Sequence, residues 1–123
     1  MSANLLARLG LACALIVAAV PAARAHAFLD HSDPAVGSTL HAPPKQVRIW
    51  FTEALEPPFS SMTVTDASGR SVGQDKAKVD PKNPALLEIG LHPLPPGTYR
   101  VNWRVVSVDT HPTEGNFTFT VKP

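Results

Sequence analysis

The chain is nearly free of sulfur. It has one cysteine and two methionines in 123 residues, and both Cys13 and Met1 lie among the first 25. The remaining residues hold no thiol, so disulfides cannot stabilise them and no thiolate is available to a metal ion. Met62 is the only thioether left, which argues against a methionine-rich metal site. Packing alone must hold the folded part together.

An excess of charge of one sign is also lacking. The chain carries 11 basic and 10 acidic residues, a formal net charge of +1. When Arg8 and Arg24 are set aside with the first 25 residues, nine basic residues face ten acidic ones and the formal charge is −1. Such a balance provides no basic face for nucleic acid.

Only one long apolar run occurs, from Leu9 to Val20, and it is too short for a membrane span. Arg8 precedes the run and Ala23-Arg24-Ala25 follows it. This is the charged start, apolar middle and small-residue cleavage site of a secretory signal peptide. We therefore expect residues 1–25 to be a signal peptide that is cut after Ala25.

Cleavage there leaves one exported domain, residues 26–123, which begins at His26 and is expected in the periplasm. Its 98 residues suffice for a single core without disulfides. A second small-residue triplet, Ala25-His26-Ala27, allows an alternative cut after Ala27 that would remove His26.

Helix signals are scarce in this domain, which has twelve prolines and no convincing 3.6-residue periodicity. Apolar residues instead alternate with polar ones, as in strands with one buried face. The inward positions that this alternation predicts are Val47, Ile49, Phe51, Met62, Val64, Leu87, Ile89, Tyr99, Val101, Trp103, Val105, Phe117, Phe119 and Val121. With an opening strand near Ala27 to Ser32, the pattern predicts an all-β sandwich of six or seven strands in two antiparallel sheets.

Two other segments have simpler interpretations. Trp50 alternates with Phe51 and is expected on the outer face of its strand. The stretch from Gln74 to Pro84 mixes acidic and basic residues, and we expect a solvated connector there.

The segment from Val108 to Gly115 joins two predicted strands and places Asp109 two residues before His111. On an extended backbone such residues point to the same side, roughly 7 Å apart at ~3.3 Å per residue. Pro112 favours that geometry, because the residue before a proline is displaced from the helical region. The pair could share one ligand. The alternative is an ordinary turn in which Asp109 bonds its own backbone and Gly115 supplies a permissive φ.

An N-terminal His26 would offer an α-amine and an imidazole together, and both can close one chelate ring on a cation. With Asp109 and His111 the donors become three nitrogens and one oxygen, a set that suits Cu(II), although zinc fits the same ligand types. A blue-copper electron carrier is excluded because it needs a thiolate. An N-terminal strand beside the strand that ends at Val108 would bring the ends together.

Several motifs together resemble the CopC-type periplasmic copper-binding proteins over essentially the whole exported domain. They are His26-Ala27, the turn Asp33-Pro34-Ala35-Val36-Gly37-Ser38, Phe51-Thr52-Glu53, the run from Trp103 to Pro112 with its Ser-x-Asp-x-His pattern, Gly115, and Phe117-Thr118-Phe119. The resemblance implies a Greek-key β-sandwich, immunoglobulin-like or cupredoxin-like. It also implies one Cu(II) per chain, bound by His26, Asp109 and His111.

The resemblance has limits at particular positions. Some family members carry a further imidazole at the third mature residue, where this chain has Phe28, and others carry a methionine-rich Cu(I) site that is absent here. A Cu(II)-only binder is therefore implied, with Glu53 as a residue that orients a ligand imidazole. His31 and Glu114 lie close in sequence to the proposed ligands. We expect His31 in a solvated loop. We expect Glu114 to be exposed, and near enough to His111 to tune it without touching the metal.

These features predict a monomeric protein, not an enzyme, that sequesters or delivers copper in copper homeostasis or resistance. The resemblance adds an inner-membrane copper importer as a partner. Two alternatives remain. One is a histidine-brace copper monooxygenase, and the other is a metal-free immunoglobulin-like accessory module.

Overall fold

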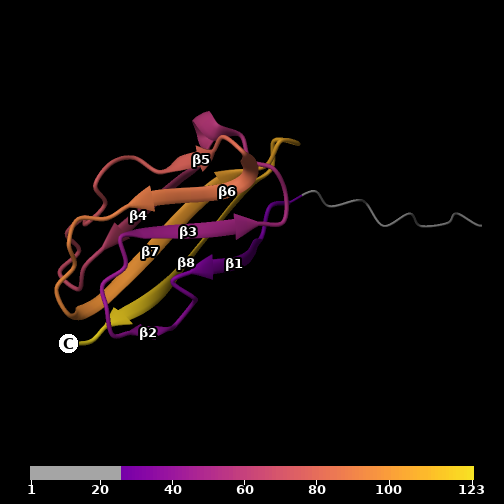
Figure 1. Ribbon diagram of the computed structural model, residues 1–123. Coiled ribbons are helices and arrows are strands. Elements are labelled where there is room, and N and C mark those ends of the chain that lie inside the picture. The colour runs from indigo at the N-terminus through magenta and orange to yellow at the C-terminus, as the bar shows by residue number, and fades with distance from the viewer. Residues whose placement is uncertain (1–25) are drawn as a thin grey trace, which may run out of the picture.

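Two four-stranded sheets face each other in the computed structural model, which describes residues 26–123 (Figure 1). Their strand orders are β1-β3-β6-β5 and β2-β8-β7-β4. The strands are β1 (Leu29–Asp33), β2 (Thr39–Leu40), β3 (Gln46–Phe51), β4 (Ser61–Thr65), β5 (Lys78–Asp80), β6 (Asn83–Gly90), β7 (Gly97–Val106) and β8 (Pro112–Val121). The 3₁₀ helix η2 (Pro57–Phe59) precedes β4. No helix within residues 26–123 has the length and apolar character to cross a membrane.

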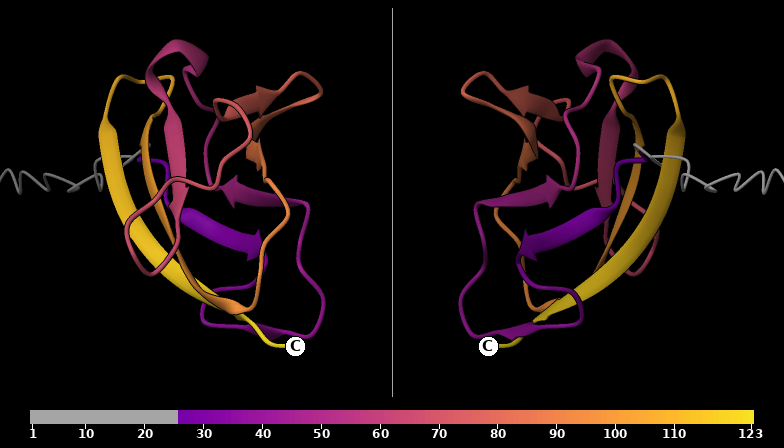
Figure 2. Two further views of the ribbon diagram at one scale, coloured as in Figure 1. Left: turned by 90° about the vertical axis from the view of Figure 1, so that its left-hand side faces the viewer. Right: turned by 90° about the vertical axis from the view of Figure 1, so that its right-hand side faces the viewer.

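The chain passes back and forth between the two layers, as the side views show (Figure 2). Hairpins join β5 to β6 and β7 to β8 within a sheet, whereas β3, β4 and β5 follow one another across the sandwich. The predicted all-β Greek-key sandwich is confirmed, although one of the two sheets is not purely antiparallel, because β2 pairs with β8 in parallel. Residues 26–123 contain eight strands and not six or seven, because β2 and β5 are too short to show an alternating pattern.

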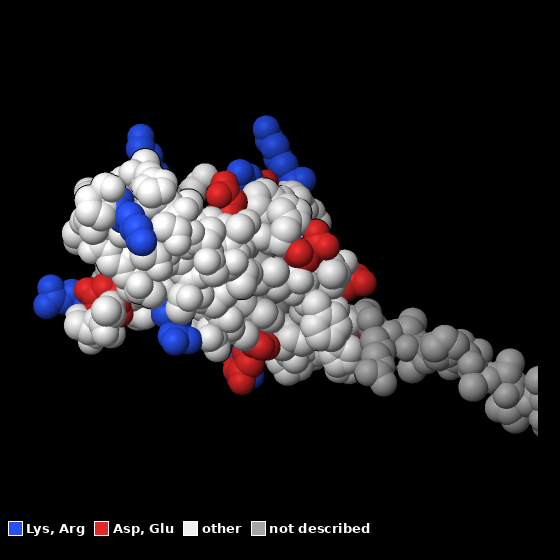
Figure 3. Space-filling view, turned by 90° about the horizontal axis from the view of Figure 1, so that it is seen from below, with Lys and Arg blue, Asp and Glu red and all other residues white. Residues whose placement is uncertain are grey.

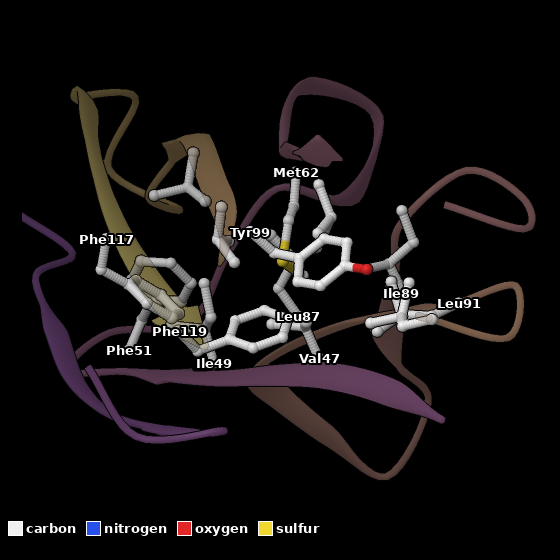
Figure 4. Close-up of a cluster of buried hydrophobic side chains, with 14 of the residues drawn as sticks. Val47, Ile49, Phe51, Met62, Leu87, Ile89, Leu91, Tyr99, Phe117 and Phe119 are labelled. Carbon is white, nitrogen blue, oxygen red and sulfur yellow. The ribbon is translucent and has the colours of Figure 1, made fainter. Parts of the chain in front are cut away.

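The core fills the space between the sheets (Figure 4). Every inward position predicted from alternation is buried except Trp103, which is partly buried. The Trp103 ring lies over Gly115, where an added Cβ would come within 2.5 Å of Trp103 Cζ2. The ring also packs edge-on against Phe51 at 5.1 Å between centroids. Gly115 therefore serves close packing, and among the described residues it is not one of the glycines with positive φ.

A buried tyrosine anchors the turn that leads into β7. The Tyr99 hydroxyl donates to the Pro95 carbonyl four residues upstream, and the ring stacks on Phe119. Burial raises the pKa of Tyr99, and the charge of Asp66 raises it further. This contact resembles the tyrosine corner of immunoglobulin-like sandwiches.

The predicted opening strand is present as β1, which runs from Leu29 to Asp33. One prediction about sheet β1-β3-β6-β5 is wrong. The stretch from Gln74 to Pro84 is not simply a connector, since it contains β5 and the start of β6. Charged residues obscured the pattern because β5 is an edge strand, in which Val79 alone packs against the core.

The outer face of the same sheet carries a stack of three side chains. Trp50 is half-buried beneath His31, whose ring is nearly parallel at 4.4 Å, and the Arg48 guanidinium lies 4.8 Å from the indole. His31 lies in β1, opposite Trp50, and not in the predicted loop, whereas its side chain is 59% exposed, as predicted. It also contacts Asp30 at 2.7 Å.

Candidate metal centre

The loop between β7 and β8 is a tight turn built around Ser107. The Ser107 backbone N–H donates to the His111 carbonyl at 3.2 Å, and the Thr110 N–H donates to the Ser107 carbonyl at 2.8 Å. Thr110 has a φ of 72°, a left-handed backbone conformation that residues other than glycine rarely adopt. The predicted extended backbone is wrong. The turn nevertheless brings His111 Nδ1 to 3.1 Å from Asp109 Oδ2.

Ser107 also fixes the carboxylate of Asp109. Its hydroxyl, which is fully buried, donates to Asp109 Oδ1. This hydrogen bond is the main cause that lowers the pKa of Asp109. Desolvation acts against it, and the neighbouring His111 adds to the lowering. Asp109 is therefore ionised at neutral pH, the state that a cation requires of a carboxylate.

The first described residues reach the same end of the sandwich. The His26 and His111 rings lie 4.6 Å apart between centroids, tilted by 45°. Ala27 is completely buried, and its carbonyl accepts a hydrogen bond of 2.6 Å from Thr113 Oγ1 at the start of β8. His26, Asp109 and His111 thus form one connected set in which His111 touches both others.

The route of the N-terminal segment differs from the prediction. Among the described residues, no N-terminal strand lies beside the strand expected to end at Val108, because β1 pairs with β3 in the opposite sheet. Instead the segment passes Thr52, whose Oγ1 accepts from the Phe28 N–H at 2.9 Å. The Thr52 N–H in turn donates to the Phe28 carbonyl at 2.9 Å. His26 is therefore placed by residues of both sheets.

The set is not a complete ligand cage in this chain. Within residues 26–123, no three histidine, cysteine, aspartate or glutamate side chains converge as a ready-made metal site. His26 follows Ala25 in the sequence, so its backbone nitrogen belongs to a peptide bond here and is not a free amine. The donors that the fold itself provides are two imidazoles and one carboxylate, of which the His111 imidazole contacts the other two.

The accessory residues have different surroundings. Glu53 is half-buried and directly follows Thr52. Glu114 points outward and faces Arg104 at 3.7 Å, with 73% of its side chain exposed. Within residues 26–123 its ion-pair partner is Arg104 and not His111. In Figure 3, acidic side chains gather toward the end of the face where the described chain begins, and carboxylates there favour approach of a cation.

Three residues that organise the site were not predicted from the sequence. Ser107 stands in the Ser-x-Asp-x-His pattern and could have been singled out from it. Thr52 and Thr113 look like ordinary outward threonines of β-strands. Their role depends on contacts between distant parts of the chain, which no local pattern indicates.

Similar proteins point to one family. A family model described as the CopC domain matches residues 29–122. Copper resistance protein C of Escherichia coli is 43% identical over 117 residues, which cover 88% of this chain and 90% of that protein. The crystal structure of CopC from Methylosinus trichosporium OB3b has a TM-score of 0.74 and 36% identity, covering 80% of this chain and 95% of that chain.

A third relative is larger. Copper transport protein CutJ of Bacillus subtilis is 35% identical over 98 residues, which cover 79% of this chain and 18% of CutJ. The family match runs from the first residue of β1 to the residue after β8 and includes Asp109 and His111. The chain is therefore a member of the CopC family, whose relatives described here are named for copper resistance and copper transport.

Proposed function

We propose that this protein, once cut after Ala25, binds one Cu(II) ion as cargo in the periplasm. His26 would contribute its α-amine and imidazole, and Asp109 and His111 would complete the site. The observation that carries the proposal is the position of His111, which contacts the His26 ring at 4.6 Å between centroids and Asp109 at 3.1 Å.

The chemistry of the donors supports copper. Three nitrogens and one oxygen suit the tetragonal preference of Cu(II), which heads the divalent affinity order for such ligands. The lowered pKa of Asp109 keeps its carboxylate ionised. A cation that replaces the proton between Asp109 and His111 would interact with both side chains. Zinc is the competitor that the ligand types also allow.

The residue content supports the oxidised ion over Cu(I). No thiol follows residue 25, and Met62, the remaining thioether, is a buried core residue. Hard oxygen and amine donors favour Cu(II), whereas Cu(I) is selected by thiolates and thioethers. The proposed function is consequently to hold or deliver Cu(II), and not to carry electrons.

A role in copper homeostasis or resistance is supported by the names of the relatives, which refer to resistance and transport and not to a catalysed reaction. We further propose that the protein is a monomer and that an inner-membrane copper importer is its partner. The similarity to part of CutJ, a protein named for copper transport, supports the partner.

Intact mass of the exported protein, with and without copper, tests the terminus and the stoichiometry together. We expect a chain that begins at His26 and gains one copper ion. His111→Ala should lose tight binding, and His92→Ala, at an exposed position after β6, is the matched control. Equal and weak uptake by wild type and His111→Ala would instead favour a metal-free module, and a chain beginning at Phe28 would remove the N-terminal ligand.

A separate assay addresses catalysis. Copper-loaded protein is given peroxide or ascorbate with an oxidisable substrate, and free copper serves as the reference. A carrier should show no turnover above the reference. Turnover above it would support the monooxygenase alternative.

A further inference from the structure

Two threonines from opposite sheets hold the segment that carries His26. Thr52 follows β3 and Thr113 lies at the start of β8. Thr113 Oγ1 donates to the Ala27 carbonyl at 2.6 Å. Thr52 Oγ1 accepts from the Phe28 N–H at 2.9 Å and lies 3.3 Å from the His26 carbonyl, to which it can donate. Each of the first three described residues is thus bonded to a threonine hydroxyl.

The hydrogen bond between Thr113 and Ala27 lies beside the contact between the His26 and His111 rings. Ala27 directly follows His26, and Thr113 lies two positions after His111. Ala27 is 0% exposed and belongs to the core. A carbonyl in such a setting strongly requires a hydrogen-bond donor, because leaving it unpaired is costly.

The residue type suits this task. The χ1 angle of a β-branched threonine is restricted in a strand, so the hydroxyl keeps one direction. Valine has the same shape and removes only the donor and acceptor. The hydrogen bond and the packing can therefore be separated by one substitution.

We infer that Thr113 and Thr52 are positioning residues that fix the N-terminal ligand opposite His111, and that Cu(II) affinity depends on their hydroxyls. This inference rests on the proposed function. Partners of metal ligands that lie outside the ligand set are typically worth about 10- to 100-fold in metal affinity. Thr113 should have the larger effect, since its bond is shorter and its acceptor is buried.

The experiment uses exported protein with a native terminus and compares wild type with Thr113→Val, Thr113→Ser and Thr52→Val. Thr98→Val is the matched control, because Thr98 contacts Thr120 across the same strand pair β7–β8 at its opposite end. Cu(II) affinity is measured by competition with a chromophoric chelator. Electron paramagnetic resonance of the bound copper reports its nitrogen donors, and thermal unfolding of the apo-protein reports folding.

We expect Thr113→Val to bind Cu(II) about 10- to 100-fold more weakly, with an altered copper spectrum. Thr113→Ser should recover the wild-type spectrum and most of the affinity, and Thr52→Val should show a smaller loss. The control should match wild type. A copper spectrum and affinity unchanged in a folded Thr113→Val protein would overturn the inference.

Wild-type protein distinguishes a failure of the proposed function from a failure of the inference about the threonines. If wild-type protein that begins at His26 takes up no Cu(II), the proposed function fails. If wild type binds Cu(II) and both valine variants bind it as tightly as wild type does, the proposed function stands and the inference about the threonines is wrong. A variant that loses affinity only in proportion to its loss of folded protein also counts against a positioning role.

Discussion

Asp109 and His111 come within 3.1 Å of each other because the residue between them, Thr110, adopts a left-handed backbone conformation. The turn is fastened by backbone hydrogen bonds between Ser107 and both Thr110 and His111. The carboxylate and imidazole are therefore held together by the loop itself before any cation binds. Such preorganisation reduces the ordering cost of binding.

Removing the Ser107 hydroxyl should weaken this arrangement. We expect Ser107→Ala to reduce Cu(II) affinity by about 10- to 100-fold, because Asp109 loses the donor that orients it. The pKa of Asp109 should also move back toward its ordinary value. Chelator competition measures the affinity. Ser68→Ala, which removes a similar bond to Asp66 in a separate turn, should leave affinity unchanged.

Adding a residue before His26 should weaken Cu(II) binding more than adding residues at the C-terminus. One glycine placed before His26 converts the proposed amine ligand into an amide, so Cu(II) binding should weaken severely. A tag after Pro123 should have no effect. The two proteins can be compared by chelator competition and paramagnetic resonance. Equal affinity would rule out the amine as a ligand.

Affinity should rise with pH in the range where an α-amine loses its proton. The unperturbed pKa of an α-amine is about 7.7 to 8.0, so Cu(II) must displace a proton below that value. Apparent affinity should climb from pH 5 toward pH 8 and level off above. Titrations in non-coordinating buffers measure this slope. An affinity that stays flat over the range contradicts amine ligation.

The turn after β4 should make stability depend on acid pH. Asp66 Oδ1 accepts hydrogen bonds from the Ser68 hydroxyl and from the Ser68 and Arg70 backbone N–H groups. Its pKa is lowered, chiefly by the Ser68 hydroxyl. The folded-state pKa lies below the unfolded one, so the stabilisation is complete above the unfolded pKa and is lost as pH falls through the folded pKa.

Asp66→Asn should therefore be less stable than wild type at pH 7 and should lose that difference in strong acid. Urea unfolding at several pH values between 7 and 2 tests this. Ser68→Ala should show part of the same pH dependence, because it removes the main cause of the shift. A constant gap between Asp66→Asn and wild type would show that the charge of Asp66 is not responsible.

Gly115→Ala should destabilise the fold. The new methyl group would lie 2.5 Å from Trp103 Cζ2, so the indole must move. Overpacking of this kind costs about 1–3 kcal/mol. Urea unfolding gives the stability, and tryptophan fluorescence reports the ring. Gly90→Ala is the control, because its Cβ would meet only the Gln74 side chain, at 3.4 Å.

Much of the fold could be predicted from the sequence because the core strands bury one face each. Alternation located the inward residues of β3, β4, β7 and β8, and all but Trp103 are buried. It failed at β5 because only Val79 of that edge strand packs against the core. His31 was misjudged because its partner, Trp50, lies on another strand.

The candidate site was predictable only in part. Asp109 and His111 are separated by one residue, so sequence spacing predicts that they lie near each other. It does not predict the left-handed turn at Thr110 that brings them to 3.1 Å. The approach of His26 depends on contacts across 86 and 24 residues, made by Thr113 with Ala27 and by Thr52 with Phe28. Tertiary contacts of this length leave no local signal.

The burial of Ala27 has a consequence for the lifetime of the processed protein. Most chain ends fray and are open to trimming. Ala27, which the proposed cut after Ala25 would make the second residue of the chain, lies in the core, with its carbonyl bonded to Thr113. An aminopeptidase could not draw the terminal histidine into its active site without first unfolding this corner. The same contacts that orient the terminus would thus protect it from exoproteolysis.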